Sequence, residues 1–341
     1  MATLNPKCIG CLETVDVLLD TGSIYLLAVE VPMKTKCNHC IDLPSDPQEY
    51  FYAGPSAKFE WHGASPILKS ISNDKAIILS SCVPVGDVPQ SSASALGLPA
   101  VMGLAPLTKE YSQRFGVASF VDQLRVKSFA FRLKDLSKPQ FSFDPKIRDL
   151  GVLIGSIPIS PQITQPTPGL GFLTTNIASL KVRFVKDGIL IEYEMIKTIA
   201  APSLPRDFQV EYVVRNNGII VSSSIMSLIQ WYVLFDSGTQ PAVFYADASV
   251  NLLGSRIDNS ILPGQSTASD FVSAQMVEFG FNGTAGLITI QASNVTVPTL
   301  TPDKFSTVCS IFTVFGYQMM LGRNLHFKIE KGLPESIDIY A

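Results

Sequence analysis

One strand-and-turn pattern occurs twice in this chain and constrains the fold more than any other feature of the sequence. The apolar run "VLLDTGS" at 17–23 carries Asp20 near its end, and "YVLFDSGT" at 232–239 carries Asp236 in the same place. An acid at the end of a buried strand is costly to bury, and function is the usual reason for keeping one there. Asp20 and Asp236 are therefore the first candidates for a functional site.

Each of these turns is followed, at nearly the same distance, by two hydrophobic residues and a glycine. The first such element is "AVMGL", in which Gly103 stands 83 residues after Asp20. The second is "MMLGR", in which Gly322 stands 86 residues after Asp236. Two spaced pairs in the same order indicate an internal repeat, and hence two related halves of the molecule.

The composition favours a protein built of strands and turns. Charged residues make up 16% and hydrophobic residues 46% of the chain, and much of the rest is Ser, Thr, Pro and Gly, which disfavours a helical architecture. Four apolar segments bounded by turn residues are predicted strands: 76–82, 127–133, 151–159 and 180–196, the last with a hairpin turn at Asp187-Gly188. Helices are expected only at 112–124 and 245–257. We therefore predict an all-β fold with few short helices.

The proline-rich passage at 156–171 has no hydrophobic periodicity and is the natural hinge between the two halves. Its position predicts an N-terminal lobe of residues 1–165 and a C-terminal lobe of residues 166–341. Each lobe then carries one of the two aspartates.

Charge and hydropathy exclude several classes of partner. The net charge of −3, without a Lys/Arg cluster, argues against nucleic acid. The longest apolar stretch, 218–235, contains four serines and a glutamine and favours strands over a membrane span. The first residues lack the basic region and apolar run of a signal peptide, so the chain either stays inside the cell or is a processed form. We expect a monomer that binds no membrane.

The cysteines leave two alternatives open. They are Cys8, Cys11, Cys37, Cys40, Cys82 and Cys309. The first four form two C-x-x-C pairs, a spacing that suits four thiolates around zinc. Disulfides of a secreted, loop-rich protein are the alternative that we favour, and two acceptor sequences for N-glycosylation, beginning at Asn282 and Asn294, agree with it.

If the two halves are related by a pseudo-twofold axis, the two turns meet and Asp20 comes within hydrogen-bonding reach of Asp236. Two carboxylates that close hold a single proton over a window of acidic pH, because Coulomb repulsion opposes the ionisation of both. The ionised member can take a proton from a water between them, and this water attacks a peptide carbonyl whose oxygen receives the other member's proton. This chemistry needs no metal and no cofactor.

The other residues of the two turns have physical roles in this arrangement. They are Thr21, Gly22, Ser23, Ser237, Gly238 and Thr239. The glycines allow sharp turns that bring amide hydrogens near the carboxylates. The first hydroxyl of each turn can bond across the interface between the turns, and the last can bond the outer carboxylate oxygen. A single Asp-x-Gly more often caps a turn, but the paired set favours catalysis.

These elements resemble the signature of the pepsin-like aspartic proteases. The residues that carry the resemblance are Asp20 to Ser23, Val101-Met102-Gly103, Asp236 to Thr239 and Met320-Leu321-Gly322. The resemblance implies a bilobal, almost entirely β fold in which the hydrophobic-hydrophobic-Gly strands form psi-shaped loops behind the catalytic turns. It further implies an endopeptidase that cleaves extended peptides at acidic pH, is inhibited by pepstatin-like statines, and is secreted or held in an acidic vacuolar or lysosomal compartment.

The sequence departs from the family in the hairpin, or flap, that covers the substrate. The corresponding stretch, "FEWHGASP" at 59–66, places Trp61, His62 and Gly63 in the flap, with Trp61 at the position of a family tyrosine. Trp61 could instead pack within its lobe, and Leu27 replaces the tryptophan that partners the tyrosine. The alternative to a protease is a binding or inhibitor protein similar to plant xylanase inhibitors, whose catalytic motifs are typically eroded. Both motifs are intact here, which favours the enzyme.

Overall fold

The structure is a computed structural model, and it describes most of the chain. The described residues are 2–6, 15–30, 48–51, 56–64, 66–70, 76–78, 83–92, 99–107, 116–159, 171–186, 188–198, 208–228, 230–239, 243–246, 271–298, 301–302 and 310–341. The chain divides into two compact units. The first comprises Met1–Lys127, Pro168–Gly171 and Ile329–Leu333, and the second Ser128–Thr167, Phe172–Lys328 and Pro334–Ala341.

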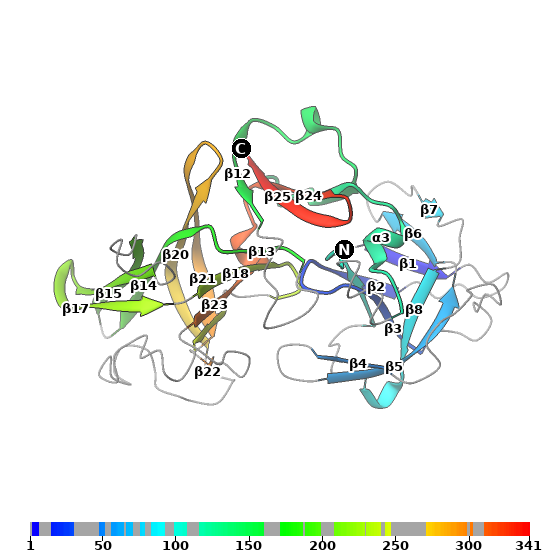
Figure 1. The fold of residues 1–341 in the computed structure, drawn as a ribbon, viewed down its shortest axis with the longest axis horizontal. Helices are drawn as coiled ribbons and strands as arrows, with labels where there is room; N and C mark the ends of the chain where they lie inside the picture. Colours follow the sequence, from blue (N-terminus) through cyan, green and yellow to red (C-terminus); the bar gives the residue numbers. More distant parts are fainter. Residues whose placement is uncertain are drawn as a thin grey trace. The chain divides into compact units, whose positions relative to one another are not determined.

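The first unit is built on one nine-stranded sheet with the order β4-β5-β8-β3-β9-β2-β1-β6-β7 (Figure 1). Its strands are β1 (Ala2–Pro6), β2 (Val15–Asp20), β3 (Leu26–Val29), β4 (Gln48–Phe51), β5 (Ser56–Ala64), β6 (Pro66–Ser70), β7 (Ala76–Ile78), β8 (Val83–Val88) and β9 (Ala100–Gly103). The unit also contains the 3-10 turn η2 (Gln90–Ser92) and the helix α3 (Phe120–Gln123).

The second unit contains three sheets. One has the order β11-β10-β24-β25-β12, from β10 (Ser128–Arg132), β11 (Gln140–Phe143), β12 (Leu153–Pro158), β24 (Asn324–Glu330) and β25 (Leu333–Tyr340). Another has the order β13-β18-β23-β19-β22, from β13 (Leu173–Thr174), β18 (Gln230–Asp236), β19 (Val243–Ala246), β22 (Thr301–Pro302) and β23 (Ser310–Gly316).

The third sheet of this unit has the order β17-β16-β15-β14-β20-β21 (Figure 1). Its strands are β14 (Ile177–Lys186), β15 (Ile189–Thr198), β16 (Phe208–Asn216), β17 (Ile219–Leu228), β20 (Phe271–Gly283) and β21 (Gly286–Pro298). Two 3-10 turns, η3 (Ile147–Asp149) and η4 (Tyr317–Met319), complete the second unit.

The all-β prediction is confirmed, and most of the predicted strands are present. The segment 180–196 forms β14 and β15, and Gly188 has a φ of +77°, the positive value that its tight turn needs. The stretch 218–235 forms β17 and most of β18, as its β-favouring residues predict. Among the described residues, no helix reaches the length and apolar content that a membrane crossing requires.

The described parts of the two predicted helices are mostly not helical. Of the predicted helix at 112–124 the structure describes residues 116–124, and among these only Phe120–Gln123 is α-helical. Of 245–257, the described residues 245–246 belong to β19, so a helix does not begin there. Short amphipathic stretches are weak helix signals, because sheet pairing with distant strands outweighs local propensity.

The predicted lobes place residues 128–159 in the N-terminal half, whereas the division into compact units places them in the second unit. These residues supply β10, β11 and β12, and β10 and β12 pair with β24 and β25 from the end of the chain. The predicted lobe boundary between residues 165 and 166 stays a prediction. All six cysteines, and with them the zinc and disulfide alternatives, lie outside the described residues.

Candidate active site

A group of four strands recurs in the two units with the same order and the same strand directions. In the first unit, β2 is antiparallel to β1 and parallel to β9, and β9 is antiparallel to β3. In the second unit, β18 is antiparallel to β13 and parallel to β23, and β23 is antiparallel to β19. Each unit thus carries its candidate aspartate as the last residue of an inner strand of this group.

The parallel pair in each group brings the aspartate beside a glycine. In the first unit Asp20 is in register with Gly103. In the second unit Asp236 is in register with Gly316. Gly322, which the sequence assigned to the corresponding psi loop, is therefore not the residue beside Asp236. The glycine that sequence reasoning missed ends the triplet Val314-Phe315-Gly316, which has the same hydrophobic-hydrophobic-Gly pattern six residues earlier.

Gly103 is required by a close approach of two backbones. A Cβ atom at this position would lie 2.4 Å from the carbonyl carbon of Ile24 and 2.4 Å from the amide nitrogen of Tyr25. The Gly103 N–H donates to the Tyr25 carbonyl at 2.8 Å, and the Leu104 N–H donates to the Asp20 carbonyl at 2.8 Å. These bonds fix the chain directly after β2 against the end of β9, so the Asp20 turn has a rigid support.

The Asp20 turn satisfies its buried carboxylate with local donors. The Asp20 side chain is only 5% exposed. Its Oδ1 accepts a hydrogen bond from the Gly22 amide at 2.8 Å, and its Oδ2 accepts one from the Ser23 hydroxyl. The hydrogen bond predicted for Ser23 is therefore present. Thr21, which the sequence also assigned to this site, is fully buried.

The Asp236 turn repeats this hydrogen-bond pattern. Oδ1 of Asp236 accepts from the Gly238 amide at 2.8 Å and from the Thr239 amide at 3.3 Å. Oδ2 accepts from the Thr239 hydroxyl at 2.6 Å, as the sequence predicts. Ser237 is buried, in the position that Thr21 occupies in the first turn, while Asp236 itself is partly exposed. In both turns one carboxylate oxygen is held by the glycine amide and the other by a hydroxyl.

Gly322 lies in the turn between η4 and β24. Its φ is +78°, and a Cβ atom there would meet nothing within 4 Å. The next residue, Arg323, donates from its guanidinium to the carbonyl oxygens of Met319 and, at 2.8 Å, of Gln291. Burial lowers the pKa of the Arg323 guanidinium from its ordinary value. This turn is therefore held to β21 and η4 and is not the strand beside Asp236.

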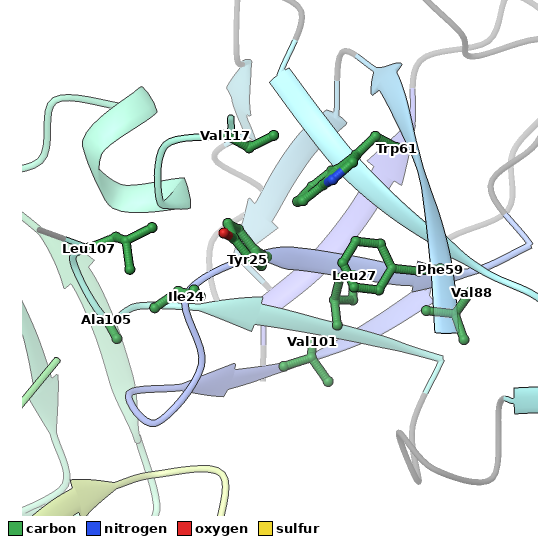
Figure 2. Close-up of a cluster of buried hydrophobic side chains, with 10 residues drawn as sticks. All are labelled: Ile24, Tyr25, Leu27, Phe59, Trp61, Val88, Val101, Ala105, Leu107 and Val117. Carbon is green, nitrogen blue, oxygen red and sulfur yellow. The ribbon is translucent and has the colours of Figure 1, made fainter. Parts of the chain in front are cut away.

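Trp61 lies in the hydrophobic core of the first unit. Its side chain is 7% exposed, and its ring meets Tyr25 edge-on at 4.9 Å between centroids and Phe59 edge-on at 5.0 Å (Figure 2). The buried cluster around it comprises Ile24, Tyr25, Leu27, Phe59, Val88, Val101, Ala105, Leu107 and Val117. Leu27 belongs to the same cluster, so it packs within the core of the first unit. A role of Trp61 in covering substrate stays a prediction.

Trp61, His62 and Gly63 all lie within the strand β5 and not in a turn, and their assignment to a substrate-covering flap stays a prediction. From residue 58 to 63 exposure and burial alternate strictly, with one partly exposed residue at His62. This period of two is that of a strand with one buried face. On the neighbouring strand β8, Trp61 pairs with Gly86, and Nε2 of His62 lies 3.2 Å from Oδ2 of Asp87. The turn of the β4–β5 hairpin, residues 52–55, lies outside the described residues.

Tyr25 is the aromatic residue near the site that sequence reasoning missed. It follows the Asp20 turn by two residues, its carbonyl accepts the hydrogen bond from Gly103, and burial raises the pKa of its hydroxyl far above the ordinary value. Its ring contacts Trp61, so it links the Asp20 turn to β5. The sequence signal for Tyr25 is its place as an aromatic residue between the Thr-Gly-Ser turn and the strand "LLAV".

The described residues contain no group of three or more His, Cys, Asp and Glu side chains placed to hold a metal ion. Within each unit the structure brings together one aspartate, its turn residues and the glycine beside it. Neither a protein-family model nor a curated protein matches this sequence.

Proposed function

We propose that this chain is an aspartic endopeptidase with a bilobal, pepsin-like fold, in which Asp20 and Asp236 activate a water molecule. The observation that carries the proposal is the repeated four-strand group. Both copies end a strand on an aspartate, set a glycine beside it, and hold its two carboxylate oxygens by a glycine amide and a hydroxyl. Turns that merely cap a loop do not require a second, distant copy of the same strand arrangement.

The proposed mechanism uses the two carboxylates as one acid–base unit. With one proton between them, the ionised carboxylate takes a proton from the water, which attacks the carbonyl carbon of an extended peptide. The protonated carboxylate donates to the carbonyl oxygen, and a tetrahedral intermediate forms. Proton transfer to the amide nitrogen then allows the C–N bond to break. The donors from Gly22, Ser23, Gly238 and Thr239 orient the carboxylates for these steps.

The pH dependence follows from this sharing of a proton. Above the acidic window both carboxylates are ionised and the acid is lost; below it both are protonated and the base is lost. We therefore propose a bell-shaped activity profile with an acidic optimum, inhibition by pepstatin-like statines, and a secreted or vacuolar or lysosomal location in which such a pH prevails.

The test is hydrolysis of denatured globin from about pH 2.5 to pH 7, comparing the wild type with Asp20→Asn and Asp236→Asn. Each substitution should lower kcat at least about 10²–10⁴-fold, because each removes one half of the acid–base unit. Asp16→Asn is the matched control, since Asp16 is an exposed carboxylate on the same strand, β2, and its loss should leave activity unchanged.

Circular dichroism and tryptophan fluorescence should show that all three variants are folded. Loss of activity in only one of the two dyad variants would contradict the shared role. A folded wild type without turnover at any of these pH values would overturn the enzyme proposal in favour of the binding protein.

A further inference from the structure

We infer that Asn282 and Asn294 are attachment sites for N-linked oligosaccharides, and that the glycan on Asn282 covers an exposed leucine at the tip of the β20–β21 hairpin. Both asparagines begin an Asn-x-Ser/Thr sequence without proline, Asn282-Gly283-Thr284 and Asn294-Val295-Thr296. The inference rests on the proposed secretory location and not on catalysis.

In the structure, the side-chain amides of both asparagines are available for attachment of a glycan. Asn282 and Asn294 are both exposed, and within the described part of the chain neither side-chain amide makes a hydrogen bond. Other asparagines use theirs: the amide of Asn176 donates to the Pro158 carbonyl at 2.9 Å, and that of Asn324 donates to the Leu150 carbonyl at 2.7 Å. A glycan on either acceptor can therefore extend into solvent without breaking a native contact.

The backbone at both sites also suits attachment on a folded hairpin. Asn282 pairs with Leu287, one pair before the Gly283–Gly286 pair that closes the turn at residues 284–285, and Thr284 is exposed. Asn294 has a φ of +54° and lies where the pairing of β20 with β21 is interrupted between Met276–Ser293 and Ala274–Val295. Asparagine tolerates this conformation better than most residues.

The position of Leu287 gives the first glycan a physical role. Leu287 is 65% exposed, and it stands directly opposite Asn282 in the antiparallel pair. Side chains in such a pair lie on the same face, with Cβ atoms about 4.5–5.5 Å apart. The first sugar on Asn282 is thus placed to cover the leucine side chain.

The transfer step takes its sugar from an oligosaccharide carried on a polyprenyl diphosphate. The side-chain amide nitrogen of Asn282 attacks the anomeric carbon, and an N-glycosidic C–N bond forms. The C–O bond to the diphosphate breaks, the polyprenyl diphosphate leaves, and a base of the transferase accepts the amide proton. No group is oxidised or reduced.

The test expresses the full chain behind an added secretory leader in eukaryotic cells and measures site occupancy by peptide mass spectrometry. Enzymatic release of the glycan in ¹⁸O-water converts each glycosylated asparagine to labelled aspartate. We expect label at residues 282 and 294. Thr284→Ala should abolish label at 282 alone, and Thr284→Ser, which preserves the acceptor sequence, should retain it.

Secreted and intracellular protein are both analysed, so a variant that folds poorly still reports its occupancy. Unlabelled Asn282 and Asn294 in wild-type protein that reached the lumen would overturn the inference. The Asp236→Asn variant should show the same occupancy as wild type, which separates this result from the fate of the proposed function.

Shielding of Leu287 is measured by comparing the Thr284→Ala and Thr284→Ser proteins. The unglycosylated Ala protein should bind more of a hydrophobic fluorescent dye, and adding Leu287→Ser should remove the difference. Equal dye binding by the two proteins would overturn the shielding role.

Discussion

Replacing Gly103 by alanine tests whether the close approach of β9 to the chain after the Asp20 turn supports the site. The new Cβ atom would lie 2.4 Å from two backbone atoms, in Ile24 and Tyr25, where an ordinary contact is 3.4–4 Å. Because backbone cannot swing aside as a side chain does, β9 and this segment must separate by about 1 Å.

That separation also affects two hydrogen bonds. The bonds from Gly103 N–H to Tyr25 and from Leu104 N–H to Asp20 are both 2.8 Å long, so a shift of about 1 Å would break them. Overpacking of about 1–3 kcal/mol and two lost bonds of about 1 kcal/mol each give a loss of about 4 kcal/mol in the free energy of unfolding. We expect a fall in Tm of about 8–16 °C.

The matched control is Gly322→Ala. Its φ of +78° costs an alanine about 1–2 kcal/mol, but no atom lies within 4 Å of the new methyl group. The chain has two tryptophans, Trp61 in the first unit and Trp231 in the second, and both are buried. Each can therefore report its own unit by fluorescence.

The assay is urea unfolding. A Trp231→Phe background leaves Trp61 to follow Gly103→Ala, and a Trp61→Phe background leaves Trp231 to follow Gly322→Ala, each compared with its own background. A loss for Gly103→Ala no larger than that for Gly322→Ala would refute the reasoning.

Two further predictions concern the pH dependence of stability. Burial raises the pKa of Asp122 above its ordinary value of 3.8, although a hydrogen bond from Ser119 opposes this. At this group the folded protein then binds more protons than the unfolded protein. The contribution of Asp122 to the free energy of unfolding is therefore fully present below pH 3.8 and is lost as the pH rises through the folded pKa. Asp122→Asn should flatten this fall in Tm measured against pH, and parallel profiles would contradict it. For Glu194, burial would raise the pKa, but hydrogen bonds from Arg215 at 2.6 Å and from Lys181 lower it below 4.5. Glu194→Gln should cost about 1 kcal/mol at pH 7 in urea unfolding, and the difference should vanish as the pH falls through the folded pKa; a constant difference would show that the ion pairs do not matter.

The local features of the two turns could be predicted from the sequence. The Asp-(Thr/Ser)-Gly-(Ser/Thr) pattern predicts that Ser23 and Thr239 bond the carboxylates, and both do. These bonds join residues only three apart, so they depend on turn chemistry and not on distant packing. The all-β character follows similarly, from the period of two and the frequent turn residues.

The strand at residues 58–63 could also be predicted from local pattern, whereas the flap role of Trp61, His62 and Gly63 stays a prediction. The alternation at residues 58–63 predicts a strand with Phe59, Trp61 and Gly63 on one face, and those residues are buried. Burial of one face determines which residues of a strand point inward, so the local pattern is enough to place these side chains.

By itself the sequence determined that each half has an aspartate at the end of a buried strand and that neighbouring donors hold its carboxylate, because these interactions span two or three residues. Only the tertiary structure decided which distant glycine lies beside Asp236. Gly316 and Gly322 both follow two hydrophobic residues at similar distances from it, so the pattern does not distinguish them. Gly316 lies there because β18 pairs in parallel with β23, and because the rings of Phe235 and Phe315 pack with their centroids 4.6 Å apart. Such long-range pairing is a property of the whole core.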